Sequence, residues 1–129
     1  MTLFNQALSY DDVLVVPQYS DIESRSEVSL ASELGTDNQF ELPIIASPMD
    51  TVVEAEMAIA LAELGALGVV HRYNTILDQK RMVWNVANAA PNKPVAAAIA
   101  ITGDFMERAE ALYNAGVTIL CVDVAHGHH

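Results

Sequence analysis

The sequence predicts an α/β fold in which short parallel β-strands alternate with α-helices. Four apolar runs begin at residues 42, 67, 95 and 117, which are 22 to 28 residues apart, and stretches of helical periodicity separate them. Each run is apolar throughout rather than alternating, as expected for strands buried on both faces. Polar residues follow all four runs, so polar loops are expected at the ends of the strands.

Composition indicates a folded protein that binds neither nucleic acid nor membranes. Of its 129 residues 52% are hydrophobic, enough for a core, while 6 Lys and Arg against 17 Asp and Glu give a net charge of −11 that repels phosphate backbones and anionic lipid surfaces. The single cysteine, Cys121, excludes an intrachain disulfide. Met1–Tyr10 lacks the pattern of a signal peptide, and no apolar span approaches the ~20 residues of a membrane helix. We therefore expect a cytoplasmic protein.

The first 41 residues are predicted to be a mostly polar and irregular lead-in. Within them, Asp11–Pro17 is interpreted as a short strand that ends at proline, and Glu27–Leu30 as a second short strand that pairs with another. We divide the chain accordingly into this lead-in, residues 1–41, and a single partial domain, residues 42–129.

The domain begins with one strand–helix unit. Leu42–Ala46 is the strand, Thr51 and Glu54 have the spacing of a capping box, and Gly65 ends the helix. The apolar face of this helix is expected to carry Met57, Leu61 and Leu64.

The second unit repeats this pattern. Leu67–His71 is its strand, and Thr75 with Asp78 is the cap of a helix that extends to about Ala89. The buried face of that helix is expected to carry Val83, Val86 and Ala90.

A proline loop at residues 91–94 leads to the third unit. Its strand is Val95–Ile101, Asp104 with Glu107 forms the cap of the helix, and Gly116 ends that helix. The fourth strand, Val117–Asp123, follows.

Such a pattern fits a closed eight-stranded (β/α)8 barrel or an open doubly wound sheet. No Gly-x-Gly-x-x-Gly follows any strand, and polar residues end all four strands, so the barrel is favoured. Four strands are then half of the barrel.

Five motifs occur in an order that resembles the N-terminal half of the IMP dehydrogenase and GMP reductase family, over nearly the whole chain. They are Tyr10–Pro17 (YDDVLVVP), Ser24–Val28 (SRSEV), Ala46–Val52 (ASPMDTV), Gly68–His71 (GVVH) and Asp123–His128 (DVAHGH).

The resemblance implies a TIM-type (β/α)8 barrel that binds a purine nucleoside monophosphate and a nicotinamide cofactor at the carboxyl ends of its strands. This chain would supply about the first four strands. Ser47 would hydrogen-bond the ribose or phosphate end of the nucleotide, and Met49 would lie against the purine. Asp123 would accept hydrogen bonds from a cofactor ribose, and Arg72 would lie near the cofactor.

The resemblance assigns no catalytic residue to this chain. The nucleophilic cysteine of the family lies in a loop after the sixth strand, and Cys121 lies inside the fourth strand, so we expect the isolated chain to be inactive. A monovalent cation in the complete enzyme is also consistent with the family.

Three functions remain open, and an IMP dehydrogenase is favoured because Ser47–Asp50 (SPMD) and His126–His128 (HGH) resemble the dehydrogenases more closely than the reductases. The dehydrogenases of this family oxidise IMP to XMP with NAD. They usually carry a paired nucleotide-sensing (CBS) module between the second helix and the third strand. In this chain a short loop at residues 90–95 takes that place, which predicts no CBS insertion. That feature resembles the reductases, which convert GMP to IMP and ammonia with NADPH. The third function is a non-catalytic half-barrel. Open sheet edges would lead it to associate with the remaining half or with itself, and the family forms homo-oligomers.

Some of these residues also have purely structural interpretations. Asp50 and Thr51 fit the start of a helix, and His71 fits packing at a strand end. The terminal group His126, His128 and His129 is too small and loose to predict a metal site. A carboxylate that ends a buried strand, such as Asp123, requires a partner.

Overall fold

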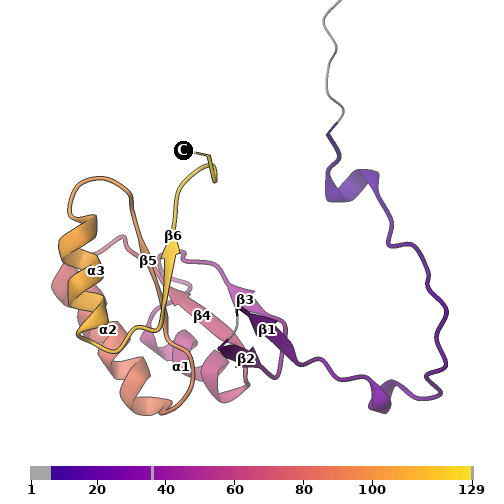
Figure 1. Cartoon of the computed structure of the whole chain (residues 1–129). Coiled ribbons are helices and arrows are strands. Elements are labelled where there is room, and N and C mark those ends of the chain that lie inside the picture. The colour runs from indigo at the N-terminus through magenta and orange to yellow at the C-terminus, as the bar shows by residue number, and fades with distance from the viewer. Residues whose placement is uncertain (1–6, 36, 129) are drawn as a thin grey trace, which may run out of the picture.

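The computed structural model describes residues 7–35 and 37–128. A four-stranded sheet with α-helices packed against it forms the body of the molecule, and a hairpin and an extended segment precede it (Figure 1). The helices in the described part are α1 (Ala55–Glu63), α2 (Ile76–Ala89) and α3 (Phe105–Tyr113). The strands of the sheet are β3 (Ile45–Ala46), β4 (Leu67–Val70), β5 (Ala96–Ile99) and β6 (Ile119–Val122).

The four strands are parallel and lie in chain order, β3-β4-β5-β6. Ile45 lies opposite Leu67, and Ala96 lies opposite both Val69 and Ile119. Because parallel crossovers are right-handed and every crossover here steps in the same direction, the helices collect on one face. There α1 packs on α2 and α2 on α3 (Figure 1). The predicted α/β fold with a parallel sheet is thus confirmed, and β3 and β6 are the edges of that sheet.

Side chains of the sheet alternate between two apolar cores. The core under the helices includes Val70, Ala97 and Ile99 of the sheet with Val83, Val86 and Leu112 of the helices. The core on the opposite face includes Leu67, Val69, Ala96 and Ala98 with Phe40. The central strands β4 and β5 are therefore buried on both faces, as predicted, whereas the edge strands β3 and β6 are partly exposed.

Gly68 allows α1 to lie close to β4. A Cβ atom at Gly68 would lie 2.8 Å from the Cα of Ala58. The helix consequently turns its small residues, Ala58 and Ala62, toward the sheet. The predicted apolar face of α1 is wrong in this respect, because Met57 and Leu64 are exposed.

The start of α2 is confirmed and the start of α1 is not. Thr75 caps α2, since its hydroxyl accepts a hydrogen bond of 3.1 Å from the N–H of Asp78. The predicted capping box of Thr51 and Glu54 is wrong, because Thr51 adopts a left-handed φ of 59° in a turn that precedes the helix. In that turn the N–H of Val53 donates to the Met49 carbonyl, and Glu54 becomes the N-cap without a side-chain hydrogen bond.

The lead-in also differs from the prediction. Tyr10–Asp12 is a 3₁₀ turn closed by hydrogen bonds from Ser9 to the Asp12 carboxylate, and a second 3₁₀ turn covers Arg25–Glu27. Such local side-chain bonds compete with strand pairing, so the predicted strands Asp11–Pro17 and Glu27–Leu30 do not form. The hairpin lies further on, between β1 (Ser32–Leu34) and β2 (Asn38–Phe40), and the segment before it extends away from the body (Figure 1).

The connection between α2 and β5 is short. Residues 90–95 join α2 directly to β5, so no CBS module lies at this point of the described chain. No helix among the described residues has both the length and the apolar character needed to cross a bilayer.

Candidate functional site

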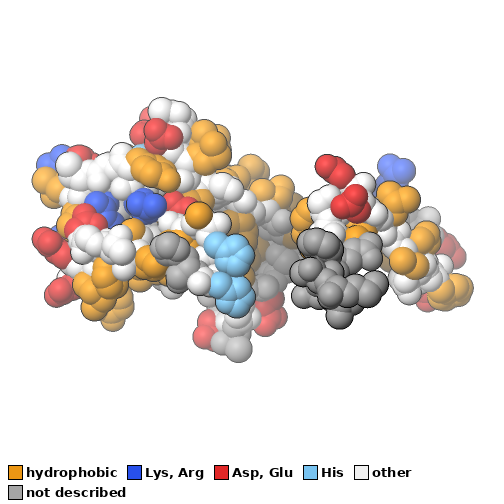
Figure 2. Space-filling view, turned by 90° about the horizontal axis from the view of Figure 1, so that it is seen from above, with side chains coloured by type: hydrophobic (Ala, Val, Ile, Leu, Met, Phe, Trp, Pro, Cys, Tyr) orange, Lys and Arg blue, Asp and Glu red, His pale blue; other side chains and the backbone are white. Residues whose placement is uncertain are grey.

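Parallel strands end at one edge of their sheet, and the predicted site residues gather along that edge. Ser47 and Met49 follow β3, Arg72 follows β4 and Asp123 follows β6. Seen from above, where β6 ends, acidic, basic and apolar side chains are mixed over the body, with exposed imidazoles beside them (Figure 2). We refer to this side of the sheet as the carboxyl edge.

Arg72 and Asp123 form an ion pair that bridges the end of β5. The Arg72 Nε donates to Asp123 Oδ2 at 3.2 Å, and an Arg72 Nη donates to the Asp123 carbonyl at 3.2 Å. The Asp123 N–H is itself held by the Ile99 carbonyl at 2.9 Å. Roughly a quarter of each side chain is exposed, 29% for Arg72 and 27% for Asp123. The two predicted cofactor residues therefore contact each other and remain accessible.

The Arg72 guanidinium also lies over an aromatic ring. Its central carbon is 5.1 Å from the ring centroid of Tyr73, within the range of a cation–π interaction. This contact and the ion pair together restrict the rotamers of a long side chain in a loop.

Ser47 and Met49 belong to a tight turn at the same edge. The Met49 N–H donates to the Ser47 carbonyl at 2.8 Å, and the Met49 carbonyl accepts from the N–H groups of Val52 and Val53. Val53 is fully buried and anchors the turn, whereas the Met49 side chain is 56% exposed. Met49 is therefore available as a contact surface and is not a core residue.

His71 is a packed histidine at the end of β4. It is buried, and its Nδ1 accepts a hydrogen bond from the N–H of Tyr73 at 3.1 Å, so its Nε2 carries the proton in the neutral ring. Nε2 lies 3.6 Å from Glu54 Oε1, beyond hydrogen-bond length, and has no hydrogen-bond partner among the described residues. These contacts agree with the structural interpretation of His71.

Behind the loop that follows β4 and carries Arg72, the Arg72 loop, lies a group of polar side chains around the buried Arg108 and Gln79, which the sequence did not reveal. We call it the Arg108 cluster. Its members are Asn74, Gln79, Asp104 and Arg108. Arg108 is 6% exposed and Gln79 is fully buried. Both occupy the apolar stripes of their helices, Gln79 four residues before Val83 and Arg108 four residues before Leu112, and this register is the signal that could have revealed them.

Asp104 begins α3 where predicted, but it does not cap the helix with its side chain. Instead its carboxylate receives two hydrogen bonds from Arg108, from Nη2 at 2.7 Å and from Nε at 3.3 Å. Hydrogen bonding to this guanidinium lowers the pKa of Asp104 below its ordinary value of 3.8. The carboxylate thus stays ionised beside the buried cation.

Cys121 is unsuited to nucleophilic chemistry. It lies in β6, partly buried against the core that contains Phe40. Burial, and secondarily the Asp123 charge, raise the pKa of its thiol above the ordinary value of 9.0, which disfavours the thiolate.

Metal ligation finds no support in the described residues. No group of three His, Cys, Asp or Glu side chains in residues 7–35 and 37–128 is arranged to hold an ion. The His126 and His128 rings have centroids 5.5 Å apart and planes tilted by 31°. His129 lies outside the described residues.

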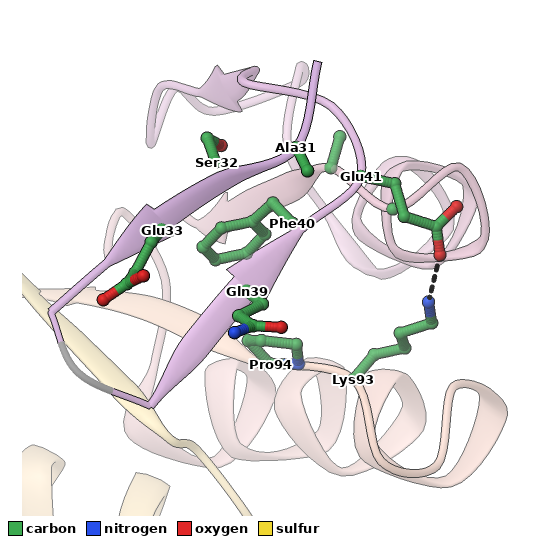
Figure 3. A pocket seen from close by; sticks show the side chains of 10 residues that line it. Ala31, Ser32, Glu33, Gln39, Phe40, Glu41, Lys93 and Pro94 are labelled. Atoms are coloured by element: carbon green, nitrogen blue, oxygen red, sulfur yellow. Dashed lines mark hydrogen bonds and ion pairs between the residues drawn. The ribbon is translucent and has the colours of Figure 1, made fainter. Parts of the chain in front are cut away.

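A cavity of about 480 Å³ opens at the opposite edge of the sheet, which we call the amino edge. Figure 3 shows Phe40 within it and Glu41 joined to Lys93 at its rim; the Lys93 Nζ lies 3.2 Å from Glu41 Oε1. None of Ser47, Met49, Arg72 and Asp123 lines this cavity. The residues that line it come from the hairpin and from the loops before β4 and β5: Ala31, Ser32, Glu33, Gln39, Phe40, Glu41, Gly65, Ala66, Lys93 and Pro94.

Comparison with known proteins identifies one family. The model of the IMP dehydrogenase / GMP reductase domain matches residues 7–129. The chain is 43% identical to an inosine-5'-monophosphate dehydrogenase of Nitrosopumilus maritimus and 40% identical to a GMP reductase of Leishmania donovani, over 64% and 65% of this chain and 17% of each relative.

A longer alignment joins the chain to an inosine-5'-monophosphate dehydrogenase of Borreliella burgdorferi. Identity is 31% over 171 aligned positions, which cover 95% of this chain and 42% of that protein. Because 171 positions exceed the 129 residues of this chain, the relative contains residues that have no counterpart here. The chain spans less than half of the length of each of these three relatives.

Proposed function

Because the chain belongs to the IMP dehydrogenase / GMP reductase domain family, we propose that it is part of an oxidoreductase that converts IMP to XMP with NAD. In this proposal β3–β6 are four of the eight strands of a (β/α)8 barrel, and residues 42–129 are the first half of that domain. The observation that carries the proposal is the Arg72–Asp123 pair at the carboxyl edge, the edge at which such barrels bind ligands.

The residues at this edge fit a nicotinamide cofactor. Arg72 bonds to Oδ2 of Asp123, and a carboxylate can accept several hydrogen bonds, so Asp123 retains capacity for a ribose hydroxyl. Arg72 would hold this carboxylate in place and add positive charge near the cofactor phosphates. When bound, a nicotinamide cofactor supplies the acceptor for a hydride.

The turn after β3 fits the nucleotide. Ser47 offers a hydroxyl for the ribose or phosphate end, and the exposed Met49 offers a polarizable surface for the purine. The raised pKa of Cys121 argues that the nucleophilic thiolate comes from another part of the complete protein. The monovalent cation of the complete enzyme, the homo-oligomer and the cytoplasmic location belong to the same proposal.

Two alternatives have their own observations. The direct loop between α2 and β5 favours a GMP reductase, which would use NADPH and release ammonia. The two open sheet edges, with Leu120 and Val122 of β6 at 41% and 52% exposure, favour a half-barrel that pairs with a partner or a second copy and contributes only nucleotide contacts.

A chimera of this chain with one of its relatives distinguishes the three proposed functions. This chain would replace the aligned segment of the Borreliella burgdorferi relative, and turnover would be measured with IMP plus NAD and with GMP plus NADPH. We expect NADH formation with the first pair and none from the 129-residue chain alone. Oxidation of NADPH with GMP would favour the reductase, and IMP binding without turnover of either pair would favour the non-catalytic half-barrel.

A further inference from the structure

The loop that carries Arg72 is fixed from behind by the Arg108 cluster. Arg108 Nη2 donates to the Asn74 carbonyl at 3.1 Å, and Nη1 donates to Asn74 Oδ1 at 3.4 Å. Asn74 in turn donates to the His71 carbonyl at 3.4 Å. Arg108 on α3 therefore holds one end of the short loop from His71 to Asn74 directly, and it reaches the other end through the Asn74 side chain.

The same guanidinium connects this loop to the sheet. Nη1 of Arg108 donates to Gln79 Oε1 at 2.8 Å. The amide nitrogen of Gln79 donates to the carbonyl of Ala98 at 2.8 Å and to that of Val70 at 3.4 Å. The ends of β4 and β5 are thus linked to α2, α3 and the Arg72 loop through one buried cation.

The hydrogen bonds that the buried Arg108 guanidinium makes have a fixed direction. Arg108 is almost fully buried, and the Asp104 carboxylate balances its charge through two hydrogen bonds. A planar guanidinium holds its partners in a fixed geometry that a lysine ammonium does not reproduce. The loop consequently has little freedom to move while Arg108 is in place.

From these contacts we infer that Arg108 is a positioning residue, which sets the Arg72 loop so that Arg72 meets Asp123. Arg72 reaches Asp123 across the end of β5 from a loop of only a few residues, so a shift of that loop would separate the two side chains. The consequence for cofactor binding rests on the proposed function, whereas the consequence for the loop does not.

Hydrogen exchange in the 129-residue chain tests the consequence for the loop. In Arg108→Met, peptides spanning residues 71–75 should exchange about tenfold faster, as should the Arg72 Nε–H followed by NMR, because charge-assisted bonds that keep the loop closed are lost. Arg108→Lys should restore part of the protection.

A matched control separates positioning from general stability. Leu112→Ala removes a buried side chain from the same helix, one turn beyond Arg108. It should lower the free energy of unfolding while residues 71–75 stay protected under native conditions. If Arg108→Met leaves the exchange of the Arg72 Nε–H unchanged, or if Leu112→Ala accelerates it equally, the inference is overturned.

Kinetics of the chimera test the consequence for the cofactor. Arg108→Met should raise the KM for NAD about tenfold and change the KM for IMP less than twofold, because Ser47 and Met49 lie on a different turn. An equal rise of both KM values would contradict the positioning role. A chimera without activity would refute the proposed function and leave the exchange result to decide the role of Arg108.

Discussion

The two edges of the sheet differ in what fills them. At the amino edge, Phe40 from the hairpin packs on apolar side chains of β4 and β5, and a cavity of about 480 Å³ remains. At the carboxyl edge, polar groups on three loops are joined by hydrogen bonds, as in the pair of Arg72 and Asp123. This cavity and the hydrogen-bonded polar groups are therefore at opposite ends of the strands.

Apolar contacts dominate the amino edge, whereas hydrogen bonds between polar groups organise the carboxyl edge. The hairpin closes the amino edge through an aromatic side chain and an exposed ion pair, which are contacts that stabilise a fold. The carboxyl edge includes accessible charged groups held by buried ones, and this is the edge at which we propose that ligands bind. We expect substitutions at the amino edge to change stability and substitutions at the carboxyl edge to change binding and activity.

The largest expected effect concerns stability at the amino edge. Phe40→Ala should lower the free energy of unfolding by about 3 kcal/mol, because a 7% exposed aromatic side chain leaves the second core. Urea unfolding followed by circular dichroism measures it. Gln39→Ala, on the exposed side of the same strand, is the control and should change stability by less than about 0.5 kcal/mol. A small effect of Phe40→Ala would mean that the hairpin is not part of the core.

Next in size is a loss of activity at the carboxyl edge. In the chimera, Asp123→Asn should lower kcat/KM for NAD roughly 100-fold, because a charged acceptor for the ribose and for Arg72 is lost. The KM for IMP and the unfolding midpoint should change little. The matching change at the other edge is Glu41→Gln, which also neutralises an ion-paired carboxylate, although a more exposed one. Equal losses from the two variants would remove the distinction between the edges.

Sequence reasoning recovered those parts of the fold that depend on local signals. The bounds and the buried face of α2 were predicted from Thr75, Val83 and Val86, because the helix cap and the helical periodicity agree there. The start of α1 was missed because the left-handed turn at Thr51 has no glycine to mark it. Pairing of Ser32–Leu34 with Asn38–Phe40 was missed because neither strand has strong strand propensity.

The sequence predicted that the candidate site residues lie at one edge of the sheet, but it did not predict the contacts between them. Placing Arg72 and Asp123 at one edge follows from parallel strands, but their direct hydrogen bond depends on the shape of the loop after β4. Gln79 and Arg108 were missed because each was read as a solvated polar residue, although its spacing of four residues from Val83 or Leu112 places it on the buried face of its helix. Only the packing of α2 against α3 brings the two together.

A smaller effect concerns the pH dependence of stability at the carboxyl edge. The pKa of Asp104 is lowered in the folded protein by hydrogen bonding to Arg108, so its stabilising contribution is fully present above its ordinary pKa of 3.8 and is lost as pH falls through the folded value. Wild type should therefore be more stable than Asp104→Asn near neutral pH, with the difference shrinking in acid. Urea unfolding over a pH series measures it. A difference that does not depend on pH would show that the charge of Asp104 contributes nothing.

The smallest expected effect is at the rim of the cavity. Lys93 and Glu41 are 40% and 75% exposed, and an ion pair in water contributes little because solvent screens it, so Lys93→Ala should change stability by less than about 0.5 kcal/mol. It should also leave the KM values of the chimera for IMP and NAD unchanged, since both ligands are expected at the opposite edge. Kinetic assays at low ionic strength make this a demanding test, because a lysine that attracted a nucleotide phosphate would act most strongly there. A rise in either KM value would make the cavity a ligand site and would reverse the roles of the two edges.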